Sequence, residues 1–159
     1  LLLADLTLSL GSLEDAIASL RRAWDELGEA DQHQRGRLAK RLAELSRQAR
    51  AYAPAIAWYE TMWEALPWLR GEADYRIASC YEELGDVELA LVRYQQIAQP
   101  PWRIRGQLAA AKLMERDGRW ERATAIYQAI TQQAVPEAKI AQERLASLRV
   151  LNEGGTSSR

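Results

Sequence analysis

The sequence is poor in the residues that build disulfides and zinc sites. It contains one cysteine and one histidine, so it forms no internal disulfide and lacks the side chains for a zinc site of the usual Cys/His composition. Cys80 is expected to be a small buried residue, and His33, in the polar run 31–34, to be exposed and inert. Because a buried thiol tolerates either redox environment, cysteine usage leaves the compartment open.

Long apolar runs are missing, and so is an excess of charge of either sign. No run approaches the roughly 18 apolar residues of a membrane span. The 21 basic and 22 acidic side chains nearly cancel, so bulk charge does not attract nucleic acid or anionic lipid. We therefore expect neither direct membrane insertion nor nucleic-acid binding. Since an apolar helix starts at Leu1 without a lead-in, the chain is expected to be a segment of a larger protein.

Catalytic motifs are also absent from the sequence. It has no Gly-rich phosphate loop, no metal-ligand spacing and no nucleophile beside a base. Glu82 and Glu83 are consecutive and point in different directions on a helix, while Asp74 lies about two turns before Glu82, which is typical of a solvated acidic face. We expect a non-enzymatic protein with no catalytic residue, no metal and no cofactor.

The sequence does contain a repeated pair of small residues. Four times an alanine is followed twelve positions later by a second alanine, and four positions after that by tyrosine or leucine. The sets are Ala4/Ala16/Leu20, Ala43/Ala55/Tyr59, Ala78/Ala90/Tyr94 and Ala111/Ala123/Tyr127. Helical apolar spacing lies between them, and Gly11, Gly85 and Gly118 each stand seven positions after a first alanine. Each repeat is predicted to be a helix, a tight turn and a second helix that crosses the first closely at the small residues.

Local signals predict how these helices begin. Ser12 and Asp86 can accept bonds from free backbone amides at a helix start, with a left-handed glycine before each. The second repeat has Arg50 where the others have glycine, and Pro54 in the first turn of its second helix is expected to compensate.

The third repeat carries a family resemblance. Residues 73–97 (ADYRIASCYEELGDVELALVRYQQI) resemble a tetratricopeptide repeat, with matching residues at Ile77-Ala78, Tyr81, Leu84-Gly85, Ala90 and Tyr94. The resemblance covers nearly all of residues 1–134 and implies an all-α, right-handed α-solenoid of helix-turn-helix units. The expected organisation is units at about 1–30, 31–68, 69–101 and 102–135, a cap helix at 137–151 and a polar tail or linker at 152–159.

The first and second units are spaced more widely than the family's period. Ala16 and Ala55 are 39 residues apart, against about 34 in the family, which implies an insertion of about five residues. We place it at 28–33, where Asp31 and Gln34 can start an extended helix.

The resemblance also implies where a partner binds. In the family, the first helices of successive units line a concave groove that holds a segment of a partner protein. The predicted groove residues are Arg37, Lys40, Arg41, Glu44, Arg47, Tyr75, Arg76, Ser79, Glu82, Glu83, Leu108, Lys112 and Arg116, and Glu115 maps to the same face. The sign of their charge alternates from unit to unit. These charges either select a partner segment of complementary charge or neutralise one another on a solvated surface. The expected neutralising pairs are Arg47 with Glu82 or Glu83, and Glu83 with Arg116.

The aromatic residues include six tryptophans and no phenylalanine. Trp58, Trp63 and Trp68 cluster at the end of the second unit and are expected to pack in the core, with stacking on a sugar or base as the alternative. Trp68 and Trp102 each stand beside a proline in a loop, where partial exposure of one or both is expected, with contact to a carbohydrate or a partner as the alternative.

The expected function is a protein-protein interaction scaffold. The last unit and the cap helix are similar to the terminal repeats of bacterial envelope proteins, which implies a larger assembly for outer-membrane secretion or exopolysaccharide export. That similarity favours the periplasm or cell envelope over the cytoplasm. The alternative is a structural spacer that stacks end to end on further repeats and self-associates through the apolar helix at 1–10.

Overall fold

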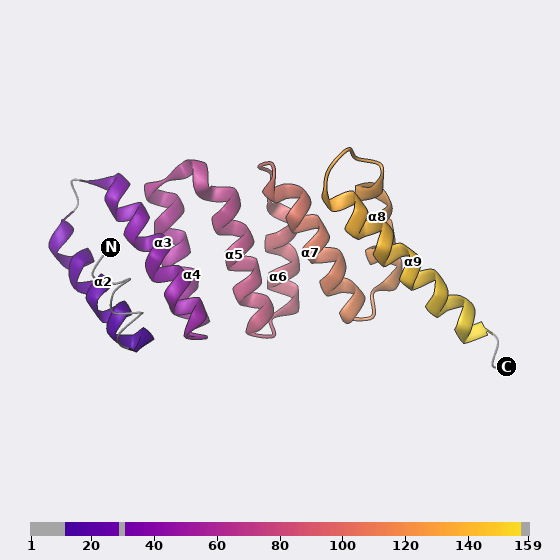
Figure 1. Ribbon diagram of the computed structural model, residues 1–159, viewed down its shortest axis with the longest axis horizontal. Helices are drawn as coiled ribbons and strands as arrows, with labels where there is room; N and C mark the ends of the chain where they lie inside the picture. The colour runs from indigo at the N-terminus through magenta and orange to yellow at the C-terminus, as the bar shows by residue number, and fades with distance from the viewer. Residues whose placement is uncertain (1–11, 29–30, 157–159) are drawn as a thin grey trace. The chain divides into compact units, whose positions relative to one another are not determined.

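A computed structural model describes residues 12–28 and 31–156, with side chains as far as residue 149. All regular elements in these ranges are helices (Figure 1), which confirms the all-α class. They are α2 (Leu13–Leu27), α3 (Gln32–Gln48), α4 (Tyr52–Ala65), the 3-10 turn η1 (Pro67–Leu69), α5 (Arg70–Glu83), α6 (Val87–Gln96), α7 (Trp102–Arg116), α8 (Trp120–Thr131) and α9 (Glu137–Thr156). None of the helices in the described ranges is long and apolar enough to cross a membrane. The predictions for Ala4, Gly11 and the helix at 1–10 lie outside the described residues.

The chain forms two compact bodies, residues 1–93 and residues 94–159, whose boundary falls inside α6. In the N-terminal body, α3 packs against both α2 and α4, and α4 packs against α5. In the C-terminal body, α8 packs against α7 and α9. Helices that follow one another in the chain are therefore packing partners within each body.

The repeated alanines lie where helices pack most closely. Every member of the four sets in the described residues is buried, with at most 2% of its surface exposed. Ala43 of α3 and Ala55 of α4 belong to one core cluster, together with Tyr59. The prediction that this spacing marks packing residues is confirmed.

Three tight turns end the first helix of a hairpin with the same geometry. In each, an amide donates to the carbonyl five residues earlier, which is the Schellman arrangement. The bonds run from Ala51 N to Ser46 O (2.8 Å), Asp86 N to Tyr81 O (2.9 Å) and Arg119 N to Met114 O (2.8 Å). The residue before each donor is left-handed, with φ of 82° at Gly85, 77° at Gly118 and 57° at Arg50. Arg50 therefore takes the glycine conformation although it carries a side chain.

Replacing Arg50 by glycine is expected to stabilise the N-terminal body by about 0.5–1 kcal/mol. The left-handed conformation costs a residue with a Cβ roughly 1–2 kcal/mol, and glycine avoids this cost. Glycine is also more flexible in the unfolded chain, which reduces the gain in stability by about 0.5–1 kcal/mol. Urea unfolding followed by circular dichroism measures the change. Gly85→Ala places a Cβ at the equivalent left-handed position and should lower the free energy of unfolding. If neither variant changes the free energy of unfolding, the two turns do not adopt the left-handed conformation.

The predicted helix starts are present. Ser12 and Asp15 form a reciprocal cap at α2. Asp31 accepts a bond from Gln34 N (2.9 Å) and begins α3, as expected for the extended helix. Asp86 accepts from Leu89 N (3.3 Å) at α6.

The ends of two other helices test the predicted boundaries. Pro54 lies in the first turn of α4, as predicted. The helix α9 begins at Glu137 but continues to Thr156, so residues 152–156 are helical where the sequence predicts a tail. No proline interrupts this stretch, and helical hydrogen bonds propagate readily once a helix has begun.

Candidate partner-binding surface

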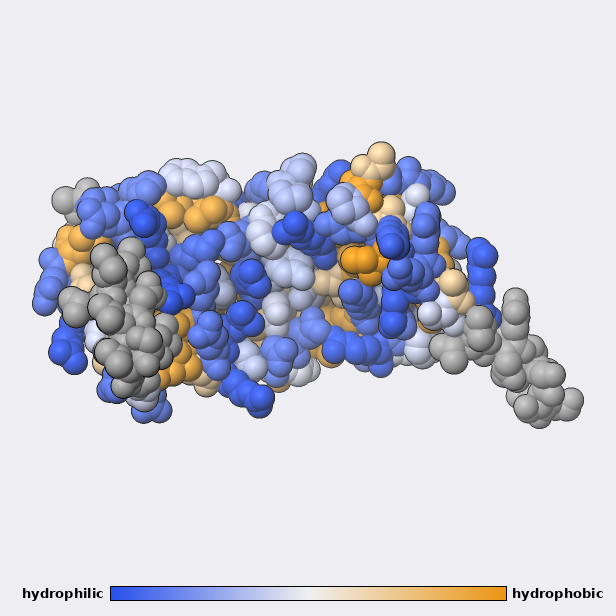
Figure 2. Space-filling model, viewed as in Figure 1, coloured by the Kyte–Doolittle hydropathy of each residue, from blue (hydrophilic) through white to orange (hydrophobic). Residues whose placement is uncertain are grey.

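Ten predicted groove residues lie on α3 and α5 of the N-terminal body. We call this set the α3/α5 face: Arg37, Lys40, Arg41, Glu44, Arg47, Tyr75, Arg76, Ser79, Glu82 and Glu83. None of the ten is buried, and Arg37 and Glu83 are exposed. Helical spacing places the members on each helix along one line. Figure 2 shows that much of the visible surface is hydrophilic.

An ion pair joins the two helices of this face. Lys40 Nζ donates to both carboxylate oxygens of Glu72, each at 2.8 Å, and the side chains are 34% and 14% exposed. Lys40 lies on the predicted line of α3, and Glu72 lies one turn before Tyr75 on α5. The polar lines of α3 and α5 therefore adjoin.

Partial neutralisation occurs on the face, but not with all the predicted partners. Arg41 Nη1 lies 3.6 Å from Glu44 Oε2. Arg47 pairs with neither Glu82 nor Glu83 in the described structure, which corrects that expectation, because its guanidinium turns inward and its Nε is buried. Glu83 accepts a bond from Tyr52 Oη (3.3 Å) instead. The other predicted pair, Glu83 with Arg116, would join the two bodies and stays a prediction.

Arg47 lies beside a buried tyrosine. Tyr59 is 1% exposed, and neither its hydroxyl nor Arg47 Nε has a hydrogen-bond partner among the described residues. Burial raises the pKa of Tyr59; the approach of the Arg47 guanidinium to the hydroxyl oxygen as a donor opposes that rise, and so do the charges of Arg76 and Arg47. Arg47 is thus close to the hydroxyl without reaching hydrogen-bond geometry.

Cys80, fully buried as predicted, lies near the same two cations. Burial raises the pKa of its thiol to about 11; Arg47 and Arg76 oppose the rise, and Glu83 adds to it. The guanidinium groups of Arg47 and Arg76 therefore act on the same two buried side chains.

Cys80 is expected to resist thiol reagents in the folded protein. With a pKa of about 11, only about one thiol in a thousand is ionised at pH 8, so we expect labelling by DTNB at least ~100-fold slower than in urea. Equal rates in both states would contradict the burial. Because the pKa of this thiol in the folded protein lies above its ordinary value of about 9, its contribution to stability is complete below about pH 9 and is lost as the pH rises towards 11.

Two residues predicted for the groove on α7 lie in the core of the C-terminal body. Leu108 is 6% exposed, which corrects its assignment as a partner contact, because it faces the packed interior of the body. Glu115 is 8% exposed and also does not present a binding surface. Lys112 and Arg116 are exposed.

Glu115 is the centre of a buried polar network. It accepts bonds from Tyr127 Oη (2.9 Å), Arg144 Nη2 (2.5 Å) and Arg144 Nε (3.2 Å). Burial and the Glu115 carboxylate raise the pKa of Tyr127, and the hydrogen bond to Glu115 raises that of Arg144. The network joins α7, α8 and α9. The sequence predicts Glu115 on the groove face and does not indicate this network.

The tryptophans divide between packed and exposed positions. Trp58 packs edge-on against Trp24 (5.0 Å between ring centroids, 74° between planes). Trp63 is half-buried beneath Arg70. Trp68 is 67% exposed, which agrees with the exposure predicted for a residue beside a proline and corrects the prediction that it packs in the core; its ring lies 6.2 Å from that of the exposed His33. Packing therefore accounts for the first two predicted members of the cluster, and Trp68 alone of the three presents an open ring.

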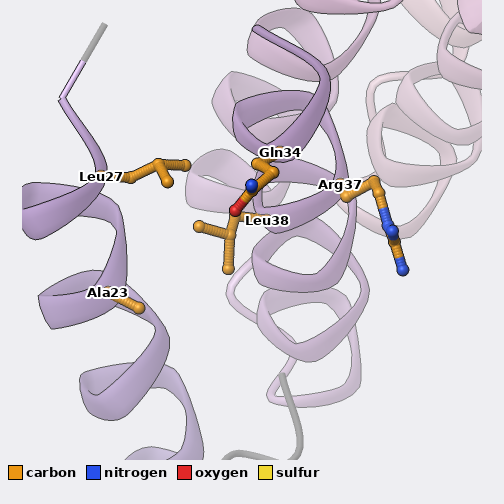
Figure 3. Close-up of a pocket in the computed structure, with 5 residues that line it drawn as sticks. All are labelled: Ala23, Leu27, Gln34, Arg37 and Leu38. Carbon is orange, nitrogen blue, oxygen red and sulfur yellow. The ribbon is translucent and has the colours of Figure 1, made fainter. Parts of the chain in front are cut away.

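A pocket lies between α2 and α3. It has a volume of about 280 Å³ and is lined by Ala23, Leu27, Gln34, Arg37 and Leu38. Figure 3 shows Leu27 and Leu38 facing each other across the gap between the helices, with Arg37 directed away from it. Among the residues that the structure describes, this lining contains no carboxylate, thiol or imidazole.

No protein-family model and no curated protein sequence matches this chain. The resemblance to tetratricopeptide repeats therefore stays a prediction. What the protein does must be argued from the geometry of its helices and their polar side chains.

Proposed function

We propose that the protein is a non-enzymatic scaffold of the tetratricopeptide type, an α-solenoid that holds a segment of a partner protein along its first helices. The observation that carries this proposal is the Lys40–Glu72 ion pair. It brings the polar lines of α3 and α5 together, although each belongs to a different hairpin. A surface built from successive first helices is what partner binding in such a repeat requires.

Two further observations support the repeat. The Schellman turns after α3, α5 and α7 share one hydrogen-bond pattern, and the alanines of successive hairpins are buried at equivalent positions. Ala55 and Ala90 are 35 residues apart, and Ala90 and Ala123 are 33 apart, close to the family's period of about 34.

The chemistry of the α3/α5 face also favours a protein partner. Most of its residues are half-buried rather than fully solvated, and partly desolvated charges interact more strongly than exposed ones. We further propose that the scaffold serves a larger bacterial envelope assembly for secretion or exopolysaccharide export. This part rests on the similarity of the last repeat and the cap helix to those of envelope proteins.

Affinity capture with matched variants tests the proposal. The first bait is the native sequence, and the second carries alanine at Arg41, Tyr75, Arg76 and Lys112. A control bait carries alanine at Glu64, Gln96 and Gln128, which are exposed on the second helices α4, α6 and α8. We expect the first variant to lose a partner that the control retains, with circular dichroism unchanged in both.

The opposite result supports the spacer. If the groove variant captures the same proteins as the native sequence, the proposed use of the face is wrong. A partner lost by the control variant alone would assign binding to the second helices.

A further inference from the structure

The two bodies contain the same side-chain slot at equivalent positions of the repeat. In the C-terminal body, Glu115, Tyr127 and Arg144 stand 4, 16 and 33 residues after Ala111. We call these three residues the C-terminal slot. Its carboxylate accepts from the tyrosine hydroxyl and from two nitrogens of the arginine, so all three side chains are satisfied.

The N-terminal body repeats this slot with one residue exchanged. Arg47, Tyr59 and Arg76 stand 4, 16 and 33 residues after Ala43. We call them the N-terminal slot. The tyrosine and the second arginine are kept, but arginine replaces the carboxylate residue. The slot thus contains two cations and a buried hydroxyl, and no carboxylate of its own.

The donors of the N-terminal slot have no partner in the part of the chain that the structure describes. Tyr59 Oη and Arg47 Nε are buried without a hydrogen bond, and neither Arg47 nor Arg76 forms an ion pair there. On the same face, Lys40 is already paired with Glu72. Leaving a buried donor unsatisfied is costly, so the slot favours an acceptor that arrives from outside.

We infer that the N-terminal slot binds the carboxylate of an acidic side chain from a partner protein through the guanidinium groups of Arg47 and Arg76, so that the partner supplies the negative charge that Glu115 supplies in the C-terminal slot. The inference rests on the proposed function and names the chemistry of the partner. A carboxylate offers two oxygens to the planar fork of a guanidinium, which makes this pairing strong and specific.

The depth of the slot favours a side-chain carboxylate over a free C-terminus. Tyr59 is 1% exposed, so a carboxylate that binds beside it must be carried on a narrow stem. The methylene groups of Glu115 provide such a stem in the C-terminal slot. Asp or Glu side chains of a partner segment can do the same, whereas a terminal carboxylate is attached directly to the bulky main chain.

Titration with a blocked peptide tests the inference. The probe is acetylated and amidated and alternates Glu with Ala; a matched peptide carries Gln for Glu, and a third has Gln with a free C-terminal carboxylate. Nitrogen-15 spectra report the Nε–H groups of Arg47 and Arg76. We expect saturable shifts of both signals with the Glu peptide and at least tenfold weaker binding of the other two. Equal binding of the Gln peptide, or no saturation by ~10 mM, would overturn the inference, and equal binding of the third peptide would overturn the side-chain source.

Supplying the carboxylate from within the chain gives a second test. Arg47→Glu reproduces the composition of the C-terminal slot, so it should abolish binding of the Glu peptide and raise the melting temperature. Arg47→Gln should weaken binding at least tenfold without that rise. The control, Arg21→Gln, removes an exposed cation from α2, outside the α3/α5 face, and should leave binding within twofold. Unchanged peptide binding by the Arg47 variants would refute the inference.

Failure here is distinguishable from failure of the proposed function. The Arg47→Glu variant can be used as a bait in the affinity capture. If the Arg47→Glu variant keeps a partner that the four-residue groove variant loses, the scaffold proposal is supported and carboxylate binding by the N-terminal slot is contradicted. If both variants keep every partner, the scaffold proposal is contradicted as well.

Discussion

Replacing Glu115 by alanine should destabilise the C-terminal body by about 2–3 kcal/mol. The change leaves the buried Tyr127 hydroxyl without its acceptor and removes the ion pair with Arg144. Breaking a buried pair typically costs about 3–5 kcal/mol, but the Arg144 side chain is 42% exposed and stays solvated, which lowers the expected loss. Urea unfolding followed by circular dichroism measures the effect.

Two variants in the same body control this prediction. Tyr127→Phe removes only a hydroxyl and should cost about 1 kcal/mol. Glu143→Ala removes an exposed carboxylate next to Arg144 on α9 and should change stability by less than about 0.5 kcal/mol. A loss at Glu115 no larger than that at Glu143 would show that the network does not stabilise the body.

Replacing Ala55 by leucine should destabilise the N-terminal body by about 3 kcal/mol, near the upper end of the cost of overpacking a core. Ala55 is fully buried in a cluster with Ala43 and Tyr59. Three added carbons have no space at this crossing, so α3 and α4 must separate. The melting temperature and the urea midpoint should both fall.

The matched control lies two residues further along the same helix. Ala57 is exposed on α4, and Ala57→Leu should change stability by no more than about 0.5 kcal/mol because leucine is nearly as good a helix former as alanine. If the two leucine variants are equally stable, the alanine spacing does not mark a close helix crossing.

The features that the sequence predicted correctly depend on short chain separations. The start of α3 is predictable because Asp31 accepts a hydrogen bond from an amide only three residues away, which is the ordinary pattern of a helix N-cap. The buried alanines were predicted because their spacing repeats. Neither inference needs knowledge of how distant helices meet.

The errors concern residues whose partners are distant in the chain. Glu115 and Arg47 lie on the line of polar residues that helical spacing assigns to the surface, yet both turn toward a buried tyrosine. Spacing gives the direction of a side chain around the helix axis but not the depth at which neighbouring helices cover it. The partner of Glu115 on α9 lies 29 residues further along the chain, and only the packing of α8 and α9 brings it near.

The turn at Arg50 illustrates a different limit. The sequence has Arg50 where the other repeats have glycine, and it predicts that Pro54 compensates for the missing glycine. The hydrogen bonds to the last carbonyls of α3 are the same as in the other turns, so the packing of the hairpin imposes the left-handed conformation in spite of its cost.

The unequal exposure of the tryptophans makes intrinsic fluorescence sensitive to where each ring lies in the protein. Trp24 and Trp58 are packed together, whereas Trp68 and Trp120 are 67% and 50% exposed. Emission from the packed pair should be blue-shifted and shielded from acrylamide, while the exposed rings should be quenched readily. Because Trp68 belongs to one body and Trp120 to the other, single Trp→Tyr variants would let fluorescence follow each body separately as the protein unfolds or binds.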